Sequence, residues 1–233
     1  MMKLIPLLLT LGMLAAIGTA KDEKPEPYSP ELVKKAEAGD AKAQGDLGGC
    51  YYVGGGVTQD YKEAVKWARK SAEQGNLWGQ HTLANAYYFG RGVTKDYKEA
   101  FKWYTKAAEQ GVAWAQYNLA TCYFEGKGVA KDNKEAVKWV TKSAEQGFAN
   151  AQYDLGRFYG EGIGVTQDYK EAVKWYTKSA EQGNAWAQYH LGMYYWQGKG
   201  VTQDSKEGEK WITLSAAQGC IPAKEKFEKL KSK

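Results

Sequence analysis

Residues 60–75 have the sequence DYKEAVKWARKSAEQG, and the same phrase returns four more times at intervals of 36 residues. The later copies cover residues 96–111, 132–147, 168–183 and, in a diverged form, 204–219. No residue is inserted or deleted between one copy and the next. A fixed period of about 20 to 50 residues is the signature of a repeat array, in which each unit buries its apolar face against its neighbours. The fold is therefore decided by a stack of short units.

Each unit is predicted to contain two helices joined by a glycine-containing turn. In the first unit these helices are expected over residues 41–53 and 60–74. Asp60 and Glu63 have the spacing of a capping box at the start of the second helix, and Gly75 suits the left-handed position that ends it. The G-x-G turn lacks the third glycine and the preceding strand of a nucleotide-binding fingerprint. The five full units are expected at residues 40–75, 76–111, 112–147, 148–183 and 184–219.

Comparison of the five units with one another identifies the positions that the fold needs. Gln44, Leu47 and Tyr51 have identical equivalents in every unit, and their spacing of three and four residues places them on one helical face. Ala64 and Trp67 belong to the matching face of the second helix. Most of the tryptophan and tyrosine content is therefore expected in the core. We predict an all-α fold, a right-handed superhelical α/α solenoid of helix–turn–helix repeats with a period of 36 residues.

The N-terminal residues 1–20 have the pattern of a secretory signal peptide. Lys3 precedes an apolar run over residues 4–17, and small residues lead to an expected cleavage site after Ala20. The alternative is an uncleaved anchor, but the run is shorter than the ~20 residues that a spanning helix needs. The residue directly after the expected cleavage site is Lys21 and not cysteine, so a lipoprotein signal is not expected. The mature chain is expected to be exported to the periplasm or secreted, without a transmembrane segment.

Three further segments flank the repeats. The proline-containing residues 21–30 are expected to form a flexible leader, with Ser29 as the N-cap of the helix that follows. Residues 31–39 match the end of a unit and are expected to be a half repeat that caps the array. Residues 220–233 are expected to contain a C-terminal capping helix.

Charge and cysteine content exclude some classes of protein. The chain has 32 Lys and Arg against 27 Asp and Glu, a net charge of +5, which does not favour a nucleic-acid partner. Its three cysteines, Cys50, Cys122 and Cys220, lie in units too far apart for an intramolecular disulfide. We expect them to act as small buried hydrophobes, with Cys220 the most exposed. A monomer is expected.

The repeated pattern A-x-A-Q-x-x-L-G-x-x-Y-x-x-G-x-G-V-x-x-D-x-x-K-A-x-x-W-x-x-K-A-A-E-Q-G resembles the Sel-1-like repeat (SLR) family, a relative of tetratricopeptide repeats. The resemblance covers about residues 40–219. It implies an α/α superhelix that acts as an adaptor for proteins or peptides. In bacteria such proteins are often exported and act in envelope signalling, secretion or host contact. Some cysteine-rich relatives carry a cysteine pair that joins the two helices of each repeat, and this chain lacks that pairing.

The positions at which the five units differ form a second pattern, which we name the variable stripe. They are positions 42, 46, 49 and 53 of the first unit and their equivalents, which share one face of the first helix. By analogy with tetratricopeptide arrays, this stripe is expected to line a concave groove that binds a protein or peptide. The predicted groove residues are Trp78, Thr82, Asn85, Phe89, Trp114, Asn118, Thr121, Asn150, Asp154, Arg157, Trp186 and His190.

Within this stripe the tryptophans and the polar residues have different expected roles. Trp78, Trp114 and Trp186 are predicted to be aromatic anchors, in keeping with the composition of interface hot spots. The alternative is that they pack between neighbouring first helices as ordinary core. The polar members are expected to hold the backbone or carboxylates of a peptide.

Two other functions are weaker alternatives. Lys62, Lys66 and Lys70 recur as a lysine stripe on the second helix, which could meet an anionic envelope polymer but is more typical of a solvated face. An enzyme is disfavoured, and no cofactor or metal is expected. The motifs S-x-x-K, S-D-N and K-T-G of β-lactamases and penicillin-binding proteins, a label given to some cysteine-rich relatives, are absent. His81 and His190 sit at unrelated positions and are expected at the surface or at an interface.

Overall fold

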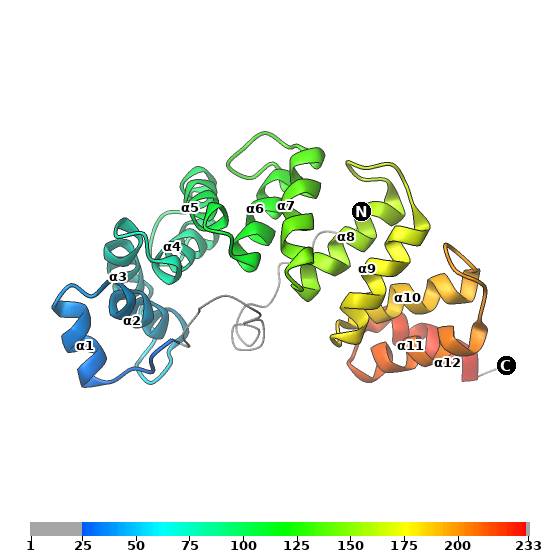
Figure 1. Ribbon diagram of the computed structural model, residues 1–233. Coiled ribbons are helices and arrows are strands. Elements are labelled where there is room, and N and C mark those ends of the chain that lie inside the picture. The colour runs from blue at the N-terminus through cyan, green and yellow to red at the C-terminus, as the bar shows by residue number, and fades with distance from the viewer. Residues whose placement is uncertain (1–24, 232–233) are drawn as a thin grey trace. The chain divides into compact units, whose positions relative to one another are not determined.

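A computed structural model describes residues 25–231 of the chain, and over that range all regular structure is α-helix (Figure 1). The helices are α1 (Pro30–Glu37), α2 (Ala41–Val53), α3 (Tyr61–Glu73), α4 (Leu77–Phe89), α5 (Tyr97–Glu109), α6 (Ala113–Glu125), α7 (Asn133–Glu145), α8 (Ala149–Glu161), α9 (Tyr169–Glu181), α10 (Ala185–Gln197), α11 (Ser205–Ala217) and α12 (Ile221–Lys231). The predicted all-α solenoid of helix pairs is confirmed. The signal peptide predicted for residues 1–20 lies outside the described residues.

The helices belong to two compact parts of the structure, each larger than one 36-residue repeat. These parts are named unit 1 and unit 2 from here on and are described separately. Unit 1 contains the residues up to Ala115 together with Lys127–Val129, and unit 2 contains Gln116–Gly126 together with the residues from Ala130 onward. Within unit 1 each helix from α1 to α5 packs against the next, and α2 also packs against α4. Within unit 2 the same succession of packed neighbours runs from α7 to α12. No helix in residues 25–231 has the length and apolar content needed to cross a membrane.

The helix ends are set by the predicted caps. The Asp60 side chain accepts hydrogen bonds from the backbone N–H groups of Lys62 and Glu63, at 2.8 and 3.1 Å. The reciprocal half of the predicted capping box does not form, because the Asp60 N–H donates to the Tyr51 carbonyl at 3.0 Å and the Glu63 carboxylate pairs with Lys66 Nζ at 3.0 Å. Gly75 has φ of +87°, the left-handed conformation in which a helix commonly stops. The same aspartate cap starts α5, α7, α9 and α11.

The glycine turn between the two helices of a repeat also fits against the preceding repeat. Gly92 has φ of +73°, and a Cβ atom at this position would collide with the carbonyl group of Tyr61. The turn after α4 therefore lies directly on the backbone at the start of α3. Only glycine satisfies both the backbone conformation and this close approach.

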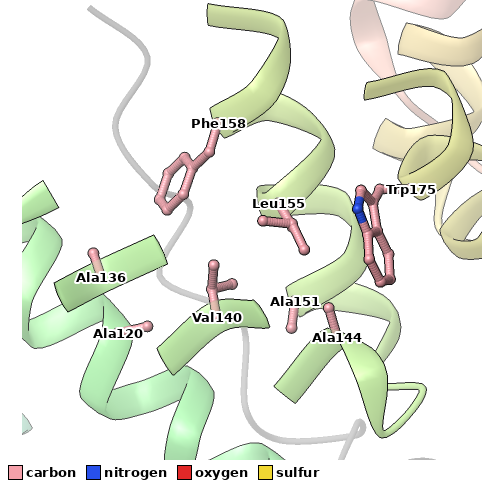
Figure 2. Packing of buried hydrophobic residues seen from close by; sticks show 8 residues of the cluster. All are labelled: Ala120, Ala136, Val140, Ala144, Ala151, Leu155, Phe158 and Trp175. Carbon is pink, nitrogen blue, oxygen red and sulfur yellow. The ribbon is translucent and has the colours of Figure 1, made fainter. Parts of the chain in front are cut away.

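In unit 2 the core is made where the invariant leucine of a first helix meets the second helices on both sides. Figure 2 shows Leu155 of α8 between Val140 of α7 and Trp175 of α9, with Leu155 fully buried. Ala144 and Ala151 leave room for α7 and α8 to approach. Of the predicted stripe, the Gln44 and Leu47 positions are buried in every repeat, whereas the Tyr51 position is only half-buried.

A glutamine pair connects the two helices of every repeat. The amide of Gln182, at the end of α9, donates to the side-chain oxygen of Gln152 on α8 at 2.7 Å. Gln152 in turn donates to the backbone carbonyl of Ala144 on α7, at 3.1 Å. Equivalent pairs form in the other repeats: Gln74–Gln44, Gln110–Gln80, Gln146–Gln116 and Gln218–Gln188. A buried amide with no partner would be costly, so these bonds explain why the position of Gln44 never varies.

At the two ends of the chain, short helices cover the apolar faces of their neighbours. Leu32 of α1 is fully buried in a cluster with residues of α2, and the Ser29 hydroxyl accepts from its N–H as the predicted N-cap. At the other end, Ala223 of α12 packs against Ile212 of α11. Cys220 belongs to the same cluster and is only 7% exposed, because α12 folds over it. The prediction that Cys220 is the most exposed thiol is therefore wrong.

Candidate functional site

In unit 1 the variable stripe carries a pair of half-buried tryptophans. Trp78 of α4 and Trp114 of α6 stack with ring centroids 6.2 Å apart and planes inclined by 25°. The imidazole of His81 lies beneath them, 4.2 Å from the Trp114 ring centroid. Neither tryptophan is fully buried, so an anchoring role for them stays a prediction.

A chain of buried hydrogen bonds supports the tryptophan pair. The Tyr104 hydroxyl donates to Asn85 Oδ1 at 2.6 Å, and Asn85 Nδ2 lies 2.9 Å from His81 Nε2. Because an amide nitrogen only donates, His81 Nε2 accepts and its ring hydrogen sits on Nδ1. Burial lowers the pKa of His81 to about 4, so the ring is neutral at pH 7.

These contacts correct three expectations about unit 1. Asn85 and Thr82 are only 2% and 3% exposed, so they lie under the surface and cannot line an open groove in this conformation. His81, expected at the surface or an interface, is 4% exposed. For Asn85 and His81 the physical reason is the same. Tyr104, from the neighbouring second helix, supplies the hydrogen bond that lets the polar pair be buried.

In unit 2 the variable stripe carries an ion pair. Arg157 Nη2 lies 3.2 Å from Asp154 Oδ1, and the Tyr117 hydroxyl donates to Asp154 Oδ2 at 2.9 Å. The Arg157 guanidinium lies over the rings of Phe124 and Phe158, at 5.2 and 5.1 Å. Burial raises the pKa of Asp154, while Arg157 and Tyr117 oppose that rise. Asp154 is 3% exposed, so it holds Arg157 in place and does not itself face solvent, contrary to its predicted groove position.

The other predicted groove residues of unit 2 have separate surroundings. Thr121 and Asn118 are half-buried on α6, and the Thr121 hydroxyl donates to the backbone carbonyl of Tyr117. Asn150 accepts from the Asn184 amide at 3.0 Å. Trp186 packs against the end cluster around Cys220, which corresponds to the core alternative for this tryptophan.

Phe89 and His190 are the last two predicted groove residues. Phe89 of unit 1 is half-buried and lies beneath the Arg91 guanidinium, at 5.1 Å. The ring of His190 in unit 2 stacks on Tyr176 with a centroid separation of 5.4 Å. Burial, with a smaller contribution from Arg157, lowers the pKa of His190 to about 4. The structure thus brings Trp78 and Trp114 together in one local site and Asp154 and Arg157 together in another.

The described end of the leader lies on the variable stripe of the first repeat, which the sequence analysis missed. The backbone N–H of Glu26 donates to Asp46 Oδ2 at 3.1 Å. The Glu26 carboxylate lies 3.2 Å from Lys35 Nζ and 3.8 Å from Lys42 Nζ. The only available signal was the Lys42–Asp46 pair, because no other repeat has charged residues at both of these stripe positions.

In the first four copies of the lysine stripe, the second and third lysines contact other side chains. Besides the Lys66–Glu63 pair, Lys70 Nζ lies 4.7 Å from the ring centroid of Trp67. The equivalent lysines lie over Trp103, Trp139 and Trp175 at 4.2 to 4.4 Å. Such contacts are typical of a solvated helix face that covers its own aromatic residues. They favour that interpretation over an anionic polymer site.

Residues 25–231 contain no group of three or more His, Cys, Asp or Glu residues that could hold a metal ion. The two histidines lie in different units, His81 beside Asn85 and His190 against Tyr176. Neither is in hydrogen-bond contact with a nucleophile in the contacts described above.

Comparison with known proteins gives one family and several similar structures. The Sel1 repeat family model matches residues 41–76, 79–112, 115–148, 149–184 and 187–220. The crystal structure of c5321, a protective antigen of uropathogenic Escherichia coli with an SLR fold, is 43% identical with a TM-score of 0.80, covering 84% of this chain and 42% of that one. A Sel1 repeat protein from Oxalobacter formigenes is 33% identical with a TM-score of 0.76, covering 84% of this chain and 85% of that one. No curated protein sequence matches the chain.

A third similar structure is a putative Sel1 repeat protein from Klebsiella pneumoniae. It is 26% identical with a TM-score of 0.56, and the match covers 88% of this chain and 100% of that one. This chain spans less than half the length of the E. coli antigen, so the match concerns only part of that protein. Each repeat matched by the family model begins within three residues of the start of a repeat predicted from the 36-residue period.

Proposed function

We propose that this chain, which belongs to the Sel1 repeat family, is a non-catalytic scaffold that binds an extended segment of a partner protein on its variable stripe. Members of the family generally serve as protein-interaction scaffolds. The observation that carries the proposal is the half-buried Trp78–Trp114 pair, set on helices whose scaffold positions are otherwise shared by all repeats.

The tryptophan pair has the properties of an interface hot spot. Each ring is held by a helix and by stacking, so little side-chain freedom is left to lose when a partner binds. Tryptophan is among the residues that most often dominate binding energy. The buried Tyr104–Asn85–His81 chain fixes the floor on which the rings rest.

Arg157 offers a polar site of matching rigidity in unit 2. Asp154 holds one edge of its guanidinium, and Phe124 and Phe158 hold its faces. Glu161 lies 3.7 Å from Nη1 and is itself exposed. A partner carboxylate or backbone carbonyl could replace water at the remaining N–H groups without reorganising the side chain.

We further infer that the chain works outside the cytoplasm. The support is the signal-peptide pattern of residues 1–20 and the similarity to a protective antigen, a kind of protein that meets the host. Cell fractionation and N-terminal sequencing test this directly. A mature chain that begins at Lys21 in the periplasmic or extracellular fraction is expected, and an intact cytoplasmic chain would contradict it.

The binding proposal is tested by comparing matched variants in affinity capture. Trp114→Leu keeps an apolar side chain over His81 but removes the aromatic ring. Arg157→Lys keeps a positive charge beside Asp154 but removes the planar guanidinium and its paired N–H donors. Lys98→Ala with Lys170→Ala changes two exposed second-helix lysines and serves as the control.

We expect wild type and the lysine control to retain a partner from envelope extract that the Trp114→Leu and Arg157→Lys variants lose. The partner, identified by mass spectrometry and purified, should then show the same order of affinity by calorimetry. Equal affinity of all variants, with unchanged circular dichroism, would contradict a role for the variable stripe.

A further inference from the structure

We propose that the surface of α1 and α2 is a binding site for an extended peptide in which an acidic residue is followed by proline and an aromatic residue. Glu26, Pro27 and Tyr28 of the chain itself occupy this site as a covalently attached ligand, which we name the tether. The inference rests on the proposed function, since Lys42 and Asp46 belong to the variable stripe of the first repeat. It adds a second site and names its ligand chemistry.

The site first binds the peptide backbone. The N–H of Glu26 donates to Asp46 Oδ2 at 3.1 Å, and the Cys50 thiol donates to the Glu26 carbonyl at a sulfur–oxygen distance of 3.7 Å. Burial raises the pKa of the Cys50 thiol, and Asp46 raises it further, so the thiol stays protonated and able to donate. Both main-chain polar groups of one residue are thus bound, as when an extended peptide adds to a receptor surface.

Two lysine ammonium groups then favour an acidic side chain at the position of Glu26. The Glu26 carboxylate lies between Lys35 Nζ at 3.2 Å and Lys42 Nζ at 3.8 Å. Lys42 also pairs with Asp46 at 2.8 Å, so its position is fixed by the protein. These exposed pairs add little affinity, but a basic residue in place of the glutamate would meet two ammonium groups. The site therefore discriminates in favour of an acidic residue.

Shape accounts for the proline and the aromatic residue. Pro27 restricts both its own backbone and that of Glu26 to extended conformations, which lowers the cost of ordering the segment. The ring of Tyr28 meets the Tyr51 ring edge-on, at a centroid distance of 6.2 Å. A Cβ atom on Gly56 would lie 3.1 Å from Tyr28 Cβ, so this glycine gives the segment its room.

The tether leaves one part of the site unused. Asp46 Oδ1 is buried and has no hydrogen-bond partner among the described residues. A buried carboxylate oxygen is a strong acceptor, and leaving it unpaired is unfavourable. A peptide that brings a second donor to Asp46 would satisfy it. The docked leader thus leaves one acceptor of the site unpaired.

The test uses the full chain with the tether weakened in place. Glu26→Ala with Tyr28→Ala removes the acidic and aromatic contacts while leaving α1 and α2 intact. The probe is a fluorophore-labelled peptide with the leader sequence KPEPYSP, followed by anisotropy. We expect the weakened-tether chain to bind it at least about tenfold more tightly than wild type, whose own tether competes from a high effective concentration.

A charge swap provides the specificity control. Lys35→Glu, added to the weakened-tether chain, should reduce binding of KPEPYSP and improve binding of the peptide KPKPYSP. Lys98→Glu, on an exposed second-helix face, should do neither. The inference is wrong if the folded weakened-tether chain does not bind KPEPYSP, or binds it no better than wild type does. It is also wrong if Lys35→Glu leaves the affinities for KPEPYSP and KPKPYSP unchanged.

The outcome is separable from that of the scaffold proposal. The peptide assay involves neither Trp114 nor Arg157, so its failure alone removes only the tethered-ligand site. If only the affinity capture with Trp114→Leu and Arg157→Lys gives the contradicting result, the proposed partner surface is wrong and the proposed peptide site at Asp46 is unaffected.

Discussion

Lowering the pH from 7.5 to 5 should destabilise this protein through its two histidines. Burial lowers the pKa of His81 to about 4, and burial together with Arg157 lowers that of His190 to about 4, against an ordinary value of 6.5. Between pH 6.5 and 4 the unfolded chain binds a proton at each site that the folded chain does not. The free energy of unfolding therefore has its full value above pH 6.5 and falls as the pH drops towards 4.

The magnitude follows from the size of the shift. With pKa values of 6.5 unfolded and about 4 folded, each histidine removes about 2 kcal/mol of stability between pH 7.5 and 5, rising to about 3 kcal/mol below pH 4. Because the stability of a domain is only about 5–15 kcal/mol, a loss of this size is large enough to measure.

Urea unfolding at several pH values, followed by circular dichroism and tryptophan fluorescence, measures the effect. Carboxylates also titrate in this range, so the informative quantity is the difference between wild type and His81→Leu. The variant loses stability at every pH because the Asn85 amide loses its acceptor, but its pH dependence should be smaller by about 2 kcal/mol between pH 7.5 and 5. His190→Leu should behave in the same way.

Direct titration supplies an independent check. The chain has two histidines, so its NMR spectrum has two sets of imidazole signals, and each single variant assigns the other set. Both should titrate near pH 4. An ordinary pKa near 6.5 for His81, or an unchanged pH dependence of stability in His81→Leu, would refute the burial argument.

Three further predictions concern stability and use urea denaturation with the wild-type slope as reference. Leu155→Ala should cost about 2–5 kcal/mol, because the leucine is fully buried between α7 and α9, and a cost under 1 kcal/mol would contradict that packing. Gly92→Ala should destabilise by more than 1 kcal/mol, because φ is positive and the new Cβ atom meets the Tyr61 carbonyl, whereas Gly55→Ala should be nearly neutral. Gln182→Ala should cost about 1–3 kcal/mol because the buried side-chain oxygen of Gln152 loses its donor, and a neutral result would show that water replaces that bond.

Much of the fold could be predicted because its signals are local. The start of α3 depends on the Asp60 side chain and N–H groups two and three residues away, and its end depends on the conformation of Gly75. The buried face follows from helical periodicity, and the repetition of one period fixes which helices are neighbours. The expected first helix over residues 41–53 coincides with α2, and the second over residues 60–74 is α3 with its two caps.

The sequence by itself therefore determined the 36-residue period, the aspartate caps and glycine stops of the second helices, and the leucine positions of the core. Only the tertiary structure decided which polar residues of the variable stripe reach solvent. Asn85 and Asp154 have the spacing of surface residues, yet tyrosines from other helices hydrogen-bond them and allow their burial. Such partners lie 19 and 37 residues away in the chain, beyond the reach of any local pattern. The docking of Glu26 on Asp46 is non-local in the same way, because it joins a proline-containing leader to a helix face through space.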